Sequence, residues 1–126
     1  MINETMEGYR ATMFDGEPGL DWLRPGWRAL RLYGRKAKAA IGTGDVALKA
    51  QMIHRADKLL TLMTGILDTG SGTTLGPVLM KIYAELGLTL LRANTANDMA
   101  ALDDFETALA TIDREMPQTF EKARSI

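Results

Sequence analysis

The chain has 126 residues, of which 46% are hydrophobic and 25% charged, and its formal net charge is −1. These values are typical of one globular domain, and the near-neutral charge gives no general attraction to nucleic acid. The absence of cysteine excludes a disulfide framework and a thiolate metal site. With one histidine and no long apolar run, we expect no metal, no cofactor, no membrane insertion and a cytoplasmic location.

The composition favours helices. Leucine, alanine and methionine occur 17, 16 and 8 times, whereas the β-branched residues valine and isoleucine occur 2 and 7 times. The first three residue types favour helices and the last two favour strands, so the sequence predicts an all-α domain.

Residues 1–24 show little periodicity and are predicted to form a mobile or docking N-terminal arm, with apolar contact candidates at Tyr9, Met13 and Phe14. The first helix is predicted over 25–41, because Pro25 suits a first helical turn and glycines follow Ile41. Its buried face comprises Trp27, Leu30, Gly34, Ala37 and Ile41.

Three more helices are predicted over 45–68, 75–96 and 99–116, with Asp45 as an N-cap and Asn97-Asp98 as a short break. Pro117 is expected to end the last helix, leaving residues 118–126 as a polar tail. Four helices with short loops predict an antiparallel up-down-up-down four-helix bundle over 25–117. The expected buried faces are Leu48, Met52, Ala56, Leu59, Met63 and Ile66, flanked by Leu60 and Leu67; Leu75, Val78, Leu79, Ile82, Leu86, Leu90 and Ala93; and Leu102, Phe105, Leu109, Ile112 and Met116.

The first helix also carries a basic stripe, and the last helix is acidic. The stripe comprises Arg24, Arg28, Arg31, Arg35 and Lys38 at steps of three and four residues. Because the first and last helices of such a bundle are neighbours, one interpretation is charge pairing between them. The other is a non-enzymatic adaptor or regulator that docks an anionic partner on this basic face.

The predicted helix 75–96 is apolar on two sides. Its second apolar face comprises Met80, Ala84, Gly87, Leu88 and Leu91. Either the rest of the chain covers this face, or it forms a groove for an apolar helix of a partner, with Ala84 and Gly87 permitting close approach. On the second interpretation these five residues are the candidate contacts, with Ile53 beside them on the preceding helix.

No catalytic arrangement is visible in the sequence. His54 falls on the polar side of its helix, and the arginine that a helical RNase motif would need before it is missing. Ser71 lies in a glycine-containing stretch without the Gly-Lys-Thr of a phosphate-binding loop. We therefore expect a protein that is not an enzyme, with a small helical RNase as the remaining catalytic alternative.

A stretch near the end of the third predicted helix resembles a known family. Ile82-Tyr83, Leu90 and the run Ala93-Asn94-Thr95-Ala96-Asn97-Asp98 are similar to the flagellin export chaperone family, FliS, over about 25–116. Ala56-Asp57-Lys58-Leu59-Leu60 is similar to the family's second-helix pattern. Ala84-Glu85 and Leu88-Thr89 differ from the residues that many members carry, which is typical of a divergent branch.

The resemblance implies a cytoplasmic chaperone that binds the C-terminal segment of flagellin. Such a protein prevents premature polymerisation and assists delivery to the flagellar type III export apparatus, whose export gate is a further candidate partner. Because flagellin termini are amphipathic, a bundle with a spare apolar face suits their binding. The resemblance also implies that the arm around Tyr9 to Phe14 lies over the binding surface in the free protein, in a monomer or an arm-swapped dimer.

Overall fold

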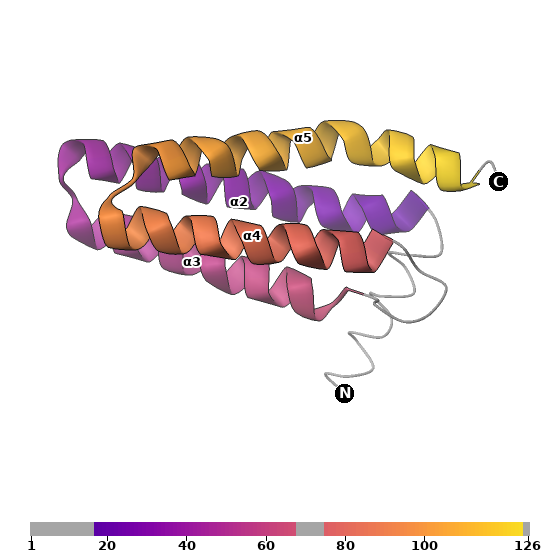
Figure 1. Cartoon of the computed structure of the whole chain (residues 1–126), viewed down its shortest axis with the longest axis horizontal. Coiled ribbons are helices and arrows are strands. Elements are labelled where there is room, and N and C mark those ends of the chain that lie inside the picture. The colour runs from indigo at the N-terminus through magenta and orange to yellow at the C-terminus, as the bar shows by residue number, and fades with distance from the viewer. Residues whose placement is uncertain (1–16, 68–74, 125–126) are drawn as a thin grey trace.

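The computed structural model describes residues 17–67 and 75–124, with side chains described over 23–67 and 75–116. It contains four helices, labelled as in Figure 1: α2 (Glu17–Thr43), α3 (Val46–Gly65), α4 (Leu75–Ala96) and α5 (Met99–Arg124). The described residues contain no strand, so the predicted all-α class is confirmed. The N-terminal arm expected from the sequence lies outside the described residues up to position 16.

The four helices form a closed ring of neighbours. α2 packs against α3 and α5, and α4 packs against the same two helices, so α2 and α4 lie diagonally opposite. The α2–α3 and α4–α5 turns lie at one end of the molecule, and α3 ends and α4 begins at the other (Figure 1). This is the predicted antiparallel up-down-up-down four-helix bundle.

Two tight turns form where the sequence predicts them. Gly44 adopts a positive φ of 74°, and the carboxylate of Asp45 accepts a hydrogen bond from the Leu48 amide at 3.0 Å. Asn97 adopts a φ of 50°, and Asp98 caps α5 by accepting from the Ala101 amide at 3.1 Å. Left-handed residues followed by carboxylate N-caps end one helix and begin the next.

The predicted start of the first helix is wrong. α2 begins at Glu17, eight residues before the expected position 25, and Pro18 occupies its first turn, where a proline is tolerated. Pro25 lies inside the helix on an exposed position. Leu23 is fully buried on the same face as Trp27, so the helix continues because its core contacts extend across the proline.

The predicted end of the last helix is also wrong. α5 continues through Pro117 to Arg124, so positions 118–124 belong to the helix rather than to a polar tail after it. A proline removes one backbone donor and costs about 3 kcal/mol inside a helix, but it leaves the residues after it free to form their own hydrogen bonds. The end of α3 differs less from its predicted position, since the helix ends at Gly65 rather than at position 68.

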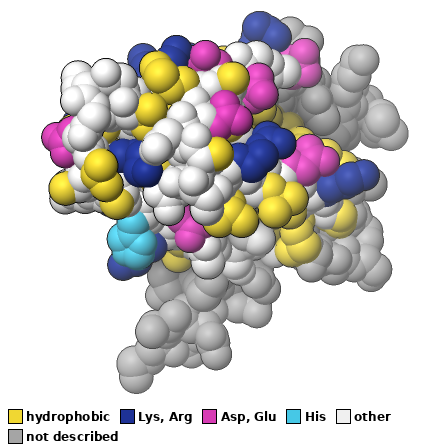
Figure 2. Space-filling model, turned by 60° about the vertical axis from the view of Figure 1, so that its left-hand side comes forward, with side chains coloured by type: hydrophobic (Ala, Val, Ile, Leu, Met, Phe, Trp, Pro, Cys, Tyr) yellow, Lys and Arg dark blue, Asp and Glu magenta, His cyan; other side chains and the backbone are white. Residues whose placement is uncertain are grey.

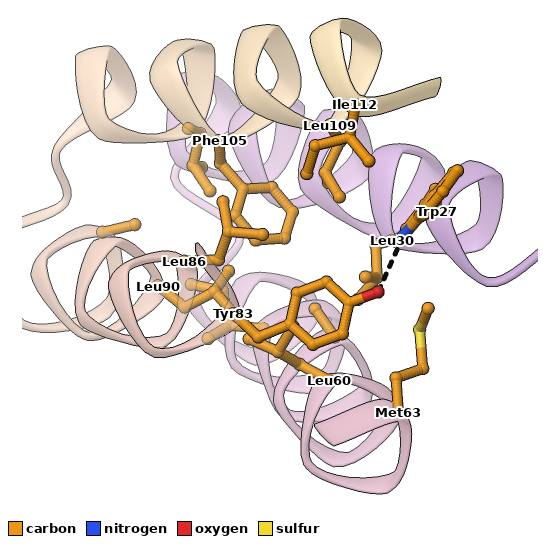
Figure 3. Packing of buried hydrophobic residues seen from close by; sticks show 14 of the residues in the cluster. Trp27, Leu30, Leu60, Met63, Tyr83, Leu86, Leu90, Phe105, Leu109 and Ile112 are labelled. Atoms are coloured by element: carbon orange, nitrogen blue, oxygen red, sulfur yellow. Dashed lines mark hydrogen bonds between the residues drawn. The ribbon is translucent and has the colours of Figure 1, made fainter. Parts of the chain in front are cut away.

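The core is a continuous apolar cluster between the four helices, with large side chains from every helix meeting in its centre (Figure 3). The predicted buried face of α5 is confirmed, and so is that of α2 except for Ile41, which is half-buried. Trp27, Leu30, Phe105 and Leu109 have no exposed surface. Leu60 and Leu67, which the sequence places beside the buried face, belong to the core and are 4% and 2% exposed.

Two residues of the predicted buried faces are exposed instead. Leu48 is 37% exposed and Val78 is 52% exposed. Both lie in the first turn of their helices, 80–100° from the direction of the core at about 100° per residue. Sequence periodicity places them at the margin of an apolar face, and the packing of neighbouring helices decides on which side of that margin they fall.

Candidate functional site

The second apolar face predicted for the third helix lies on the surface of α4. We call its five residues the α4 stripe: Met80, Ala84, Gly87, Leu88 and Leu91. Met80, Leu88 and Leu91 are 39%, 63% and 57% exposed, Ala84 is exposed, and Gly87 is half-buried. No described part of the chain therefore covers the α4 stripe.

The α4 stripe is exposed because α4 contacts the bundle on one side only. Leu79, Leu86 and Leu90 point into the core, between α3 and α5. The stripe recurs at steps of three and four residues on another side of the helix and extends for about 16 Å, or three turns. Figure 2 is turned about the vertical axis from Figure 1, so each helix keeps its height. At the height of α3 and α4, its surface carries hydrophobic side chains with charged ones between them.

A pocket of about 220 Å³ runs alongside the stripe, between α3 and α4. We call it the α3–α4 groove; its lining residues are Ala50, Ile53, His54, Asp57, Gly87, Leu90, Leu91 and Asn94. Gly87 and Leu91 belong both to the stripe and to this groove. Three of the six candidate contact residues, Ile53, Gly87 and Leu91, are thus brought together.

Ile53 has a different environment from the other candidates. The sequence places it beside a partner surface, but it is 6% exposed and belongs to the core cluster. Its side chain forms the floor of the α3–α4 groove rather than an exposed flank. Any contact that it makes with a partner is therefore limited to the part of its surface at the groove.

Gly87 leaves free space at the groove. A Cβ atom built at this position would meet only Leu60 Cδ2, at 3.9 Å, which is an ordinary van der Waals contact. Glycine is therefore not required here by the packing of the protein itself. Gly87 lines the groove together with Leu90 and Leu91 of α4.

Most of the polar lining of the groove comes from α3, and α4 adds Asn94. His54 and Asp57 are exposed and line the groove, as expected for a polar face. Within the described residues, no group of three or more histidine, cysteine, aspartate or glutamate side chains is placed to hold a metal ion. An apolar floor with a polar margin is suited to holding an amphipathic segment.

The basic stripe of α2 is paired with α5. Arg24 Nε and Arg28 Nε lie 3.0 and 3.8 Å from Asp113, and Arg31 and Arg35 lie 3.6 and 3.2 Å from Glu106. Lys38 Nζ lies 2.5 Å from Asp103. All five cations thus have a carboxylate on α5 as a partner. This confirms charge pairing between the first and last helices and removes the observation that favoured an anionic partner on α2.

Sequence reasoning missed a buried polar pair. Trp27 Nε1 donates a hydrogen bond to the Tyr83 hydroxyl at 2.8 Å across the core, joining the diagonal helices α2 and α4 (Figure 3). Burial raises the pKa of Tyr83 to about 12, and the bond from Trp27 opposes this effect in part. The sequence does contain a signal for the burial of Tyr83, because this residue lies four residues after Leu79 and seven before Leu90 on the buried face.

Lys49 is a second buried polar residue that the sequence did not single out. Its side chain is 9% exposed, and its Nζ donates to the Asn94 carbonyl at 3.1 Å and to Asn97 Oδ1 at 2.7 Å. Asn94 and Asn97 belong to the run of residues that carries the family resemblance. Only the folded arrangement brings Lys49 to them from another helix.

The three candidate arm residues, Tyr9, Met13 and Phe14, lie outside the described residues. Their contact with the α4 stripe, and the expected monomer or arm-swapped dimer, stay predictions. None of the described helices is long and apolar enough to cross a membrane.

Comparison with known proteins gives one family. The model of a family described as flagellar protein FliS matches residues 28–122, about three-quarters of the chain. No curated protein matches the chain. The matched segment contains the basic stripe from Arg28 onward, the α3–α4 groove and the whole α4 stripe.

Proposed function

This chain belongs to the FliS family of flagellar proteins, and on that premise we propose that it binds the C-terminal helical region of flagellin on the α4 stripe. Membership implies the role of a flagellin export chaperone. The observation that carries the proposed surface is an exposed apolar stripe of three helical turns beside an open groove. An amphipathic helix lays its apolar face into a groove of this kind.

The proposed mechanism is protection by burial. The apolar face of the flagellin segment packs on Met80, Leu88 and Leu91, while its polar face stays in water beside His54 and Asp57. Removal of this apolar surface from water favours binding and also hides the surface that would polymerise. Ordering a flexible segment costs free energy, which sets the affinity well below what the buried area alone suggests.

The chaperone releases its client without covalent chemistry. We propose that it acts in the cytoplasm, prevents premature polymerisation and assists delivery to the flagellar export apparatus, with the export gate as a second partner. Non-covalent binding suits this sequence of events, because a bound segment can be passed on unchanged.

Substitution on the α4 stripe tests the proposed surface. We expect Leu88→Asp and Leu91→Asp each to weaken binding of the C-terminal flagellin segment of the same genome by about tenfold or more, since each charge would be buried in the complex. Isothermal titration measures the affinity. Circular dichroism should show unchanged helicity, because both side chains are more than half exposed.

Leu32→Asp is the matched control. Leu32 is 46% exposed on α2, the helix diagonally opposite α4, so the same change of residue should leave the affinity unchanged. Equal binding by the wild type and both α4 variants would place the flagellin site elsewhere on the protein. Absence of binding by the wild type would contradict the proposed client itself.

A further inference from the structure

Lys49 connects α3 to the end of α4 through a buried ammonium group. It is the fourth residue of α3, and its Nζ donates to Asn94 O in the last turn of α4 and to Asn97 Oδ1 in the α4–α5 turn. The last carbonyls of a helix lack partners within the helix and lie at the negative end of its dipole. A buried cation at this point supplies both a donor and a favourable charge.

The same connection lies at one end of the α3–α4 groove. Ala50, the residue after Lys49, and Asn94, whose carbonyl accepts the Lys49 bond, both line the groove. Asn97 adopts a left-handed φ of 50°, which directs the chain from α4 into α5 at this point. The bond to Asn94 therefore joins the two walls of the groove beside its lining residues, and the bond to Asn97 ties α3 to the turn that follows α4.

We propose that Lys49 is a positioning residue that sets the separation of α3 and α4 and thereby keeps the groove in the geometry that receives the flagellin segment. This inference rests on the proposed function. Lys49 itself is almost fully buried and acts through the placement of Ile53, Gly87 and Leu91 rather than by touching the client. A preformed groove binds more tightly because less ordering is needed on binding.

Graded removal of the connection tests the proposal. Lys49→Met keeps a similar shape and removes both hydrogen bonds, whereas Asn97→Gly removes one and still permits the left-handed backbone. Asn94 and Asn97 are exposed, so water can reach their oxygens in Lys49→Met and the variant is expected to fold. We expect flagellin affinity to fall about tenfold in Lys49→Met and less in Asn97→Gly, by isothermal titration with the full chain.

Ile112→Val is the control for general loss of stability. Ile112 is buried on α5, which is not a neighbour of α3, so this variant is destabilised away from the groove. All titrations are made well below the lowest melting temperature in the set. Positioning requires normal affinity in Ile112→Val and reduced affinity in Lys49→Met. Normal affinity in Lys49→Met, or losses that simply follow the melting temperatures, would overturn the proposal.

Amide hydrogen exchange separates failure of this inference from failure of the proposed function. In Lys49→Met we expect residues 90–96 to exchange about tenfold faster than in the wild type, and residues 105–112 to be unchanged. A wild type that binds no flagellin segment would contradict the proposed function, and the exchange would still decide whether Lys49 holds the end of α4. Unchanged exchange at 90–96 would overturn the positioning role. If Lys49→Met does not fold, Asn97→Gly decides by the same two measurements.

Discussion

The hydrogen bond between Trp27 and Tyr83 shows how single polar atoms are handled inside an apolar core. Both side chains are almost fully buried, at 0% and 1% exposure, and the bond of 2.8 Å gives the indole N–H its acceptor. A buried donor without an acceptor is costly, so the two residues depend on each other. Because they come from diagonal helices, the bond also fixes how α2 and α4 are placed across the bundle.

We expect Tyr83→Phe to lower the free energy of unfolding by about 1–3 kcal/mol, because Trp27 Nε1 loses its acceptor while the ring volume is kept. Urea denaturation followed by circular dichroism measures the change. Tyr33→Phe, at a half-buried position of α2, is the matched control and should change stability much less. A loss in Tyr83→Phe no larger than in the control would show that the bond contributes little.

The same pair predicts a specific loss of stability at high pH. Burial raises the pKa of Tyr83 from 10.0 to about 12, so between these values the unfolded chain loses the tyrosine proton while the folded chain keeps it. The contribution of protonated Tyr83 to the free energy of unfolding is therefore complete below pH 10. It is lost as the pH rises, by about 2 kcal/mol at pH 12. The wild type should lose this much more stability than Tyr83→Phe over that range. Parallel pH profiles would contradict the raised pKa.

At the scale of the helices, charge pairing and apolar burial divide the surface of the bundle. The α2–α5 side is closed by five ion pairs, which are partly exposed and individually worth about 0–1 kcal/mol. They specify which helices are neighbours more than they stabilise the fold. The α3–α4 side has the groove and the α4 stripe instead, and this is the apolar surface on which we propose that a partner docks.

Gly87→Ala separates the stability of α4 from the function proposed for its surface. An added Cβ meets only Leu60 Cδ2 at 3.9 Å, and alanine is favoured over glycine inside a helix by about 0.5–1 kcal/mol. We therefore expect a more stable protein that binds the flagellin segment more weakly, because the methyl group enters the groove. Thermal unfolding and titration measure the two effects.

Gly42→Ala provides the matched control for this change. Gly42 is also a helical glycine whose added Cβ would have one distant contact, Met99 Cε at 3.9 Å, and it does not line the groove. It should gain stability without a change in flagellin affinity. Undiminished binding by Gly87→Ala would show that the client does not approach α4 closely at this point.

At the scale of the whole molecule, the charge distribution is nearly balanced. The formal net charge is −1, and the cations that could form a basic surface on α2 are neutralised by α5. The protein therefore has little long-range attraction for a charged partner. On the proposed function, the binding free energy comes instead from the burial of apolar surface on α4.

We accordingly expect flagellin binding to depend weakly on ionic strength. Between about 0.05 and 0.5 M salt, Kd should change by less than roughly threefold, since screening acts on exposed charges and leaves apolar contacts largely intact. Titration at both salt concentrations measures this. A much larger weakening at high salt would indicate that exposed charges, rather than the α4 stripe, dominate the interaction.

The outcome at individual residues shows where sequence reasoning succeeds and where it stops. The turns at Gly44-Asp45 and Asn97-Asp98 were predictable because backbone conformation and N-capping depend on neighbouring residues alone. The helix ends at Glu17 and Arg124 were not, because Pro25 and Pro117 are local signals for a boundary that core contacts or continued helical hydrogen bonds override. The α4 stripe was identified from periodicity, whereas the burial of Ile53 was not.

The sequence by itself determined the helical class, the order of the four helices, the capped turns, the apolar surplus on α4 and the resemblance to the FliS family. These properties follow from propensity, period and local capping, which act over a few residues. Only the tertiary structure decided that the basic stripe forms ion pairs with α5, that Trp27 donates a hydrogen bond to Tyr83, and that Lys49 joins α3 to the end of α4. Each of these contacts joins residues more than 40 positions apart, so the register between packed helices, which no local pattern contains, sets them.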